Sequence, residues 1–243
     1  MHPDSPVHPD PEDIIEALRP LGSAERASQQ RRYLKSELDF LGVRLPDLRD
    51  VVKRLRRNQF SREEVTALWC QPLFEARLAA VELLRLHIRE LDASDLPRIE
   101  RLVREGAGWA LVDPLAGDIA GQIAVRHPQP AWLVIDTWAD DHDFWLRRAA
   151  LLCLLPGIRA GRPDLDRLNR YADAMLGEKE FFIRKAIGWV LRELSKKDPG
   201  YVSAWTESRL AAMSGVTFRE AVRRLPEPDA ARLTAARSYP AGR

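Results

Sequence analysis

The feature that most constrains the fold is a six-residue pattern that recurs along the chain. An apolar residue is followed three positions later by an arginine and five positions later by an alanine. The four copies are Phe74-x-x-Arg77-x-Ala79, Phe144-x-x-Arg147-x-Ala149, Phe181-x-x-Arg184-x-Ala186 and Val216-x-x-Arg219-x-Ala221. Their first residues are 70, 37 and 35 positions apart, and 70 is two steps of 35. A period of this length is typical of repeat proteins built from pairs of helices.

The period predicts a further copy that starts at position 109, and there the pattern changes. Trp109 takes the apolar position, but Val112 replaces the arginine and Pro114 replaces the alanine. An acid, Asp113, lies between them. Because residues i and i+4 share a face of a helix, Trp109 and Asp113 bring an indole and a carboxylate to one place. The altered copy is therefore the first candidate for a functional site.

The rest of the sequence also indicates an all-α protein. Apolar residues recur at helical spacing, as in Val65, Leu68 and Trp69, and no segment alternates convincingly as a strand would. We expect about a dozen helices in a HEAT-like α-solenoid of paired antiparallel helices with a concave basic groove. The expected organisation is a disordered segment over 1–10, a single repeat domain over 11–226 and a loose tail over 227–243.

Composition narrows the possible classes of protein. The net charge of the 243 residues is only +2, so binding to nucleic acid requires local clusters of positive charge. Cys70 and Cys153 lie in apolar helical patterns and are expected to be buried thiols, and no Cys/His spacing suggests a metal or cofactor. The longest apolar run is too short to span a bilayer, and the first residues do not resemble a signal peptide. We expect a cytoplasmic protein without metal or cofactor.

Basic residues cluster on the predicted helices that carry the repeated pattern. Arg147 and Arg148 lie in one copy, and Arg184, Lys185 and Arg192 lie on the next helix of this kind. Stacked side by side, such helices would form a stripe that follows a phosphate backbone. The alternative is that each run is a solvated helix face with ion pairs inside its own helix.

The altered copy also has two interpretations. In the first, Trp109 and Asp113 belong to an active site. In the second, Trp109 is a core residue and Asp113 caps the start of a helix, which Gly108 before it and Pro114 after it would suit.

Four stretches of the sequence carry a family resemblance. They are Tyr33-Leu-Lys-x4-Phe40-Leu-Gly-Val43, Trp109-x3-Asp113, Phe144-Trp-Leu-Arg-Arg-Ala-Ala150 and Glu180-Phe-Phe-Ile-Arg-Lys-Ala-Ile-Gly-Trp-Val-Leu-Arg-Glu193. Together they resemble the AlkD family of DNA alkylation-repair glycosylases. The resemblance extends over nearly the whole chain. It implies a HEAT-like solenoid that binds duplex DNA and excises positively charged N3- and N7-alkylated purines, without flipping the base into a pocket.

The resemblance also implies roles for individual residues. Asp113 matches the catalytic carboxylate, and Trp109 and Trp189 match the aromatic residues around it. Arg148 matches the basic residue that steadies the DNA beside the lesion. The remaining candidates for DNA binding are Tyr33 and Arg192 at lesser cleft positions, Lys185 and Arg147 from the basic stripe, and Arg44, which stands where the family suggests a neutral polar residue.

These assignments favour a monofunctional glycosylase that acts as a monomer on double-stranded DNA containing 3-methyladenine or 7-methylguanine. Nothing marks Lys185 as desolvated, so no lysine is a candidate for a Schiff base. A non-catalytic HEAT-like module that binds DNA or a protein partner is the alternative function. The two differ in whether Asp113 lies in an open cleft with Trp109 and Trp189 or is a buried cap.

Overall fold

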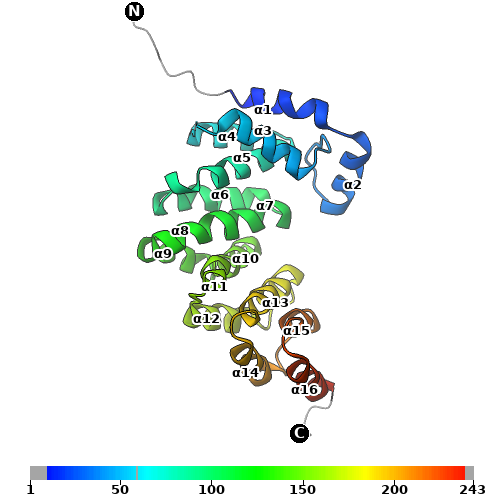
Figure 1. Cartoon of the computed structure of the whole chain (residues 1–243), viewed down its shortest axis with the longest axis vertical. Helices are drawn as coiled ribbons and strands as arrows, with labels where there is room; N and C mark the ends of the chain where they lie inside the picture. Colours follow the sequence, from blue (N-terminus) through cyan, green and yellow to red (C-terminus); the bar gives the residue numbers. More distant parts are fainter. Residues whose placement is uncertain (1–9, 59, 239–243) are drawn as a thin grey trace, which may run out of the picture. The chain divides into compact units, whose positions relative to one another are not determined.

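The computed structural model describes residues 10–58 and 60–238, and within them the chain is all-α (Figure 1). No β-strand occurs in these two ranges, and one isolated bridge joins Asp39 to Leu73. The predicted all-α class is confirmed. The chain divides into two compact units, with the boundary between Leu115 and Ala116.

The first unit holds seven of the named α-helices. They are α1 (Pro11–Leu18), α2 (Ala24–Leu34), α3 (Leu45–Arg56), α4 (Arg62–Trp69), α5 (Phe74–Leu86), α6 (Leu96–Gly106) and α7 (Trp109–Pro114). Three short 3₁₀ segments connect them: η1 (Arg19–Leu21), η2 (Ile88–Glu90) and η3 (Ala93–Asp95). A π-helical stretch, η4 (Leu115–Ala120), follows α7.

The second unit continues with α8 to α16. They are α8 (Gly121–Arg126), α9 (Pro128–Trp138), α10 (Phe144–Leu152), α11 (Leu155–Arg159), α12 (Leu165–Met175), α13 (Phe181–Ser195), α14 (Pro199–Arg209), α15 (Gly215–Val222) and α16 (Glu227–Ser238). Side-chain caps define several helix starts in this unit, because an oxygen of the preceding residue accepts a backbone N–H of the first turn. Asp143 caps α10, Glu180 caps α13 and Ser214 caps α15 in this way.

The repeated pattern marks helix starts in both units. Its first residue begins α5, α7, α10 and α13, and it is the second residue of α15. The alanines at the sixth position, Ala79, Ala149, Ala186 and Ala221, are all fully buried. In the first unit α5 packs against α7 and also against α3, and in the second unit α13 packs against α10 and α15. The predicted register is confirmed, and small buried side chains allow the close packing.

The arginine of the pattern donates hydrogen bonds to main-chain carbonyls near the ends of neighbouring helices. Arg77 Nη1 donates to the carbonyl of Glu105 at 3.1 Å, at the end of α6. Arg184 Nε donates to the carbonyl of Glu178 at 2.7 Å, just before α13. A charged donor on a main-chain carbonyl is a strong hydrogen bond, so these arginines stabilise the repeat.

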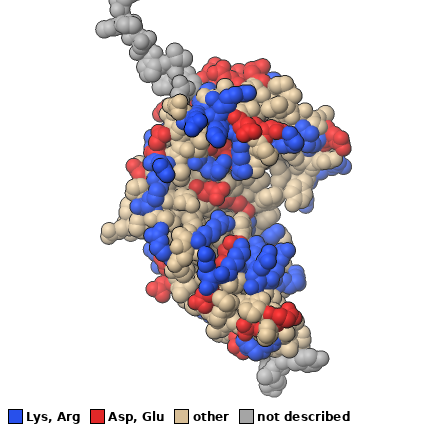
Figure 2. All heavy atoms as spheres, viewed as in Figure 1, with Lys and Arg blue, Asp and Glu red and all other residues tan. Residues whose placement is uncertain are grey.

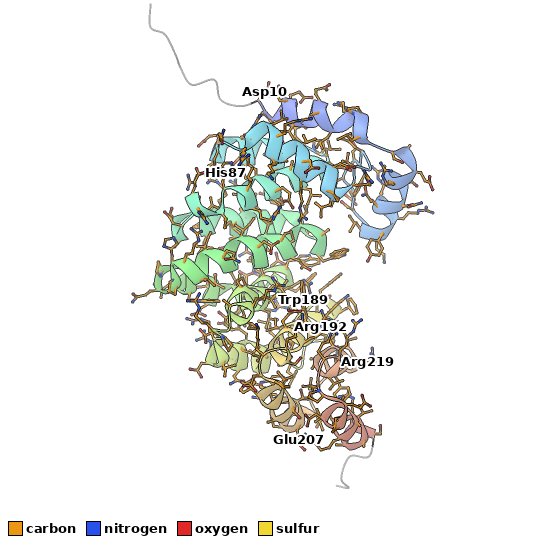
Figure 3. All side chains as sticks on the ribbon, viewed as in Figure 1. Asp10, His87, Trp189, Arg192, Glu207 and Arg219 are labelled. Atoms are coloured by element: carbon orange, nitrogen blue, oxygen red, sulfur yellow. The ribbon has the colours of Figure 1, made fainter. Side chains whose placement is uncertain are left out.

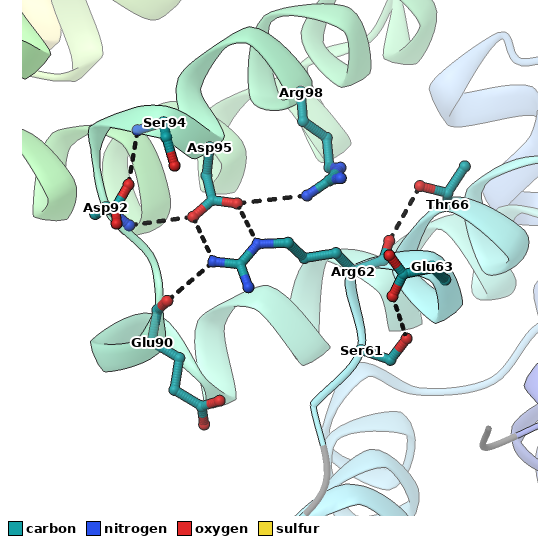
Figure 4. Close-up of polar contacts among 9 residues, drawn as sticks. All are labelled: Ser61, Arg62, Glu63, Thr66, Glu90, Asp92, Ser94, Asp95 and Arg98. Atoms are coloured by element: carbon teal, nitrogen blue, oxygen red, sulfur yellow. Dashed lines mark hydrogen bonds and ion pairs between the residues drawn. The ribbon is translucent and has the colours of Figure 1, made fainter. Parts of the chain in front are cut away.

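The other helix of each pair is joined to its neighbours by polar contacts. In the first unit, Arg62 of α4 forms a two-point ion pair with Asp95, at 2.7 and 2.9 Å, and Arg98 also contacts this carboxylate (Figure 4). In the second unit, Asn169 Oδ1 of α12 accepts the Tyr201 hydroxyl at 2.9 Å and Trp205 Nε1 at 2.8 Å, both from α14. The contacts of Arg62, Tyr201 and Trp205 each span about one repeat length.

Asp136 of α9 accepts several hydrogen bonds from α12 in the second unit. Its carboxylate accepts Arg167 Nε at 2.9 Å, Arg170 Nη2 at 2.6 Å and the Tyr171 hydroxyl, all from α12. Burial alone would raise the pKa of Asp136, but the hydrogen bonds from Arg167 and Tyr171 outweigh it, and the pKa is lowered. The ionised carboxylate therefore stabilises the folded state.

We expect Asp136→Asn to lower the free energy of unfolding at pH 7 by about 2–3 kcal/mol, since hydrogen bonds to a charged acceptor are lost. The folded pKa lies below the ordinary value of roughly 3.9, so this stability is present above that value and is lost as the pH falls through the folded pKa. Urea denaturation at pH 7 and pH 3 measures both effects. A wild type and variant that differ as much at pH 3 as at pH 7 would contradict the assignment.

Three local expectations need correction. The tail expected to be loose over 227–243 is helical over α16, where Leu233 is fully buried, and residues 239–243 lie outside the described range. Of the segment expected to be disordered, 1–9 lie outside the described range, whereas Asp10 is the N-cap of α1. Cys153 is buried as expected, but Cys70 is exposed because it follows the end of α4.

A search of the described helices finds none that is long and apolar enough to cross a membrane.

Candidate functional site

Trp109 and Asp113 lie on α7, the helix of the altered repeat. The backbone of Ala107 is left-handed, with φ 37°, and Gly108 then serves as the extended N-cap of α7. Asp113 is the fifth residue of this helix, so the hypothesis that it caps a helix start is wrong. Both side chains are partly exposed. Their spacing places the indole and the carboxylate on one face of α7, as the sequence predicts.

Tyr33 of α2 packs against Trp109. The two ring centroids are 5.8 Å apart and the planes meet at 83°, which is an edge-to-face contact. Tyr33 is 74% exposed, an unusual position for a large aromatic side chain. The structure therefore brings together two of the predicted site residues of the first unit.

A buried carboxylate that the sequence analysis missed holds the chain that follows α2. Glu75, in the first turn of α5, is 1% exposed. Its oxygens accept the backbone N–H groups of Leu41 at 3.0 Å, Gly42 at 2.8 Å and Val43 at 3.2 Å. Three donors compensate the cost of burying the charge. The only signal in the sequence is an acid inside an apolar helical pattern.

Arg148 of α10 is a buried cation in the second unit. It is 2% exposed, and its Nη1 donates to the carbonyl of Phe182 at 2.6 Å. Its guanidinium also lies 5.8 Å from the centre of the Phe182 ring, which packs against Trp145 at 4.8 Å. Arg148 is thus held in a fixed position at the start of α13, rather than extending freely into solvent.

One face of α13 carries three more of the predicted residues, Lys185, Trp189 and Arg192, beside Phe181. Phe181, Lys185, Trp189 and Arg192 fall within an arc of about 80°, and none of them is buried. Lys185 Nζ lies 5.8 Å from the centre of the Phe181 ring, and Phe181 is 49% exposed. Arg192 pairs with Glu220 of α15. The labels in Figure 3 show Trp189 and Arg192 on α13 and Arg219 on α15.

Close packing of α13 and α15 brings more cations to this face. A Cβ on Gly188 would lie 2.5 Å from the Glu220 Cβ, so only glycine allows the approach. Figure 2 shows Lys and Arg side chains gathered over α13 and α15. We call this set the α13–α15 basic surface; it consists of Lys185, Arg192, Arg219, Arg223 and Arg224. The sequence analysis did not single out Arg223 and Arg224, although the run that begins at Arg219 was a visible signal.

Two other predicted DNA-binding residues are engaged in local ion pairs. Arg147 binds both oxygens of Glu178, at 2.9 and 2.7 Å, and donates to the carbonyl of Asp141. Arg44 binds both oxygens of Asp47, at 2.7 and 2.9 Å, and this contact raises the pKa of Arg44. Arg147 therefore has a structural role in the repeat, and DNA contacts by these two residues stay predictions.

No group of three or more His, Cys, Asp or Glu side chains suited to a metal ion occurs in residues 10–58 and 60–238.

Comparisons with known proteins agree with the fold. A family model described as DNA alkylation repair enzyme matches residues 14–225. One similar solved structure is described as a predicted DNA alkylation repair enzyme from Enterococcus faecalis; the match has a TM-score of 0.77 at 23% identity and covers 85% of this chain and 97% of that one. At this identity the structural match shows the shared fold. No curated protein sequence matches this chain. Because the family model spans most of its length, the chain belongs to the DNA alkylation repair enzyme family.

Proposed function

We propose that the protein is a DNA glycosylase that releases positively charged N3- and N7-alkylated purines from duplex DNA. The observation that carries the proposal is the pairing on α7 of a partly exposed carboxylate, Asp113, with Trp109, which in turn contacts the exposed ring of Tyr33. Membership of a DNA alkylation repair family supports it. Asp113 is the catalytic carboxylate of the proposal, and Trp109 is its aromatic partner. The catalytic role of Trp189 stays a prediction.

The chemistry needs few protein groups. Alkylation at N3 or N7 gives the purine a positive charge, so the base leaves as a neutral molecule when the glycosidic bond breaks, and no general acid is needed. Positive charge develops on the deoxyribose as the bond breaks. A carboxylate stabilises that charge and orients the attacking water. Each indole ring stabilises a cation near its face by about 0.5–2 kcal/mol.

DNA binding is assigned mainly to the second unit. Exposed cations of the α13–α15 basic surface would neutralise backbone phosphates. A DNA contact by Arg148 stays a prediction, because its guanidinium is buried against the Phe182 carbonyl. In the proposed mechanism the enzyme acts as a monomer through hydrolysis alone, without a Schiff base and without taking the base into a closed pocket.

The direct test is to incubate the protein with a methylated DNA duplex and to identify the free bases by chromatography. We expect release of 7-methylguanine and 3-methyladenine and no release of unmodified guanine or adenine. If the protein binds the duplex but releases no base, the glycosylase hypothesis is wrong and the protein is a non-catalytic DNA-binding module.

The basic surface gives a separate prediction for Lys185→Ala. We expect the duplex Kd to rise by about three- to tenfold and the slope of log K against log salt to flatten by roughly 0.9, because one phosphate contact is lost. Fluorescence anisotropy at several salt concentrations measures both. Arg170→Ala removes an exposed arginine of α12 and is the matched control. Equal slopes for wild type and the Lys185 variant would remove Lys185 from the binding surface.

A further inference from the structure

A cavity of the first unit lies beside Trp109. Its volume is 520 Å³, within the range of pockets that bind small molecules. Its walls are residues 34–39 at and after the end of α2, Pro72, Phe74 and Arg77 of α5, and residues 105–111 from the end of α6 into α7. All of these lie in the first unit.

Two strained backbone positions lie in the wall of this cavity. Lys35, with φ 51°, is the C-cap of α2, and Ala107, with φ 37°, is the C-cap of α6. They are the only non-glycine residues with positive φ in the part of the chain that the structure describes. Glycine is the usual residue at such helix ends, because an L side chain there is strained. Strain of this kind gathers at sites that bind ligands.

The wall also has a definite chemistry. Trp109 and Phe74 supply aromatic surface, and Lys35 and Arg77 supply cationic donors. Two of the three wall carboxylates have partners, since Asp39 accepts Arg31 Nη2 at 2.8 Å and Glu105 accepts Trp69 Nε1 at 2.8 Å. Glu37, the third, is exposed and lines the cavity. Aromatic walls with cationic donors and a carboxylate acceptor suit a planar heterocycle that has both an acceptor and a donor on its edge.

A guanine-type base has these features. Its O6 accepts a hydrogen bond, and its exocyclic amino group donates one. Trp109 lies on the cavity wall and also on α7 with Asp113. A base freed by hydrolysis beside Asp113 could therefore stack on the Trp109 ring. Once its bond to the sugar has broken, the base is neutral and no longer tied to the strand.

We propose that this cavity binds the purine base that the enzyme releases, with 7-methylguanine as the representative ligand. This inference rests on the proposed function. It adds a product site, which would slow the departure of the base and make the reaction sensitive to free base in solution.

The test uses free 7-methylguanine and the full chain without DNA, followed by ligand-observed NMR. We expect saturable binding with a Kd of roughly 1 mM, the affinity of a weak small ligand. Gly108 lines the cavity, and a Cβ there meets only the Gly106 carbonyl at an ordinary 3.5 Å. Its φ of −169° suits any residue. Gly108→Leu should therefore place a side chain at the cavity without strain at its Cβ and weaken binding about tenfold or more.

Two further variants complete the design. Gly177→Leu makes the same change where nothing lies within 4 Å of an added Cβ, and it should bind like wild type. Glu37→Gln keeps the size of the side chain and should weaken binding several-fold. Unchanged binding in both Gly108→Leu and Glu37→Gln, or no saturable binding by wild type, would overturn the product site.

The outcome is separable from that of the proposed function. Release of 7-methylguanine from DNA without binding of the free base would reject the cavity assignment alone. Binding of the free base that Gly108→Leu abolishes, in a protein that releases nothing from DNA, would reject the glycosylase and keep a purine site.

Discussion

Asp113→Asn is expected to lower the rate of 7-methylguanine release by about 10²–10³-fold, because the variant no longer stabilises positive charge on the sugar. Asparagine has nearly the same size and shape as aspartate, so α7 should form as before. The measurement is single-turnover release from a methylated duplex, which reports the bond-breaking step without product departure. Duplex affinity, measured in parallel by anisotropy, should change by less than about threefold.

The matched control is Asp140→Asn, which removes the same charge at an exposed position just after α9. It should excise at the wild-type rate, which separates a local role of Asp113 from the effect of overall charge on DNA binding. If Asp113→Asn releases 7-methylguanine at a rate within about tenfold of wild type, Asp113 is not the catalytic group. Loss of binding together with activity would instead give Asp113 a structural role.

The repeated pattern predicted where several helices start, because it depends only on residues close together in the sequence. An apolar residue that begins a helix and an alanine that must be buried recur wherever one helix stacks on the previous one. That regularity located α5, α7, α10, α13 and α15 to within one residue. It also showed where the rule is broken, so Trp109 and Asp113 could be selected from the sequence.

Contacts between residues far apart in the sequence could not be predicted in this way. Glu75 is an ordinary acid in the sequence, and its function depends on three N–H groups more than thirty positions away. Asp136 likewise acquires its role from α12. For the cationic side chains the sequence gives too little distinction, because Arg148 and Lys185 take the same position in their copies of the pattern. Only the fold shows that Arg148 is buried against the Phe182 carbonyl whereas Lys185 is exposed.

The loop held by Glu75 also depends on a glycine. Gly42 has φ 76°, a backbone conformation that L residues adopt only with strain. A Cβ at this position would lie 2.2 Å from the Ser23 carbonyl oxygen and 2.6 Å from the Ala27 nitrogen, both main-chain atoms of or next to α2. These atoms cannot move without displacing the start of the helix that carries Tyr33.

Gly42→Ala should therefore lower the free energy of unfolding by about 4 kcal/mol or more, which places it among the most harmful single substitutions. Gly161→Ala is the control, because Gly161 has nearly the same φ, 73°, but nothing lies within 4 Å of its added Cβ. That variant should cost only about 1–2 kcal/mol, the price of the left-handed backbone alone. Urea denaturation measures both, and the difference isolates the contact with α2. Equal losses would mean that the chain around Gly42 can relax, and α2 would then not depend on this close approach for its position.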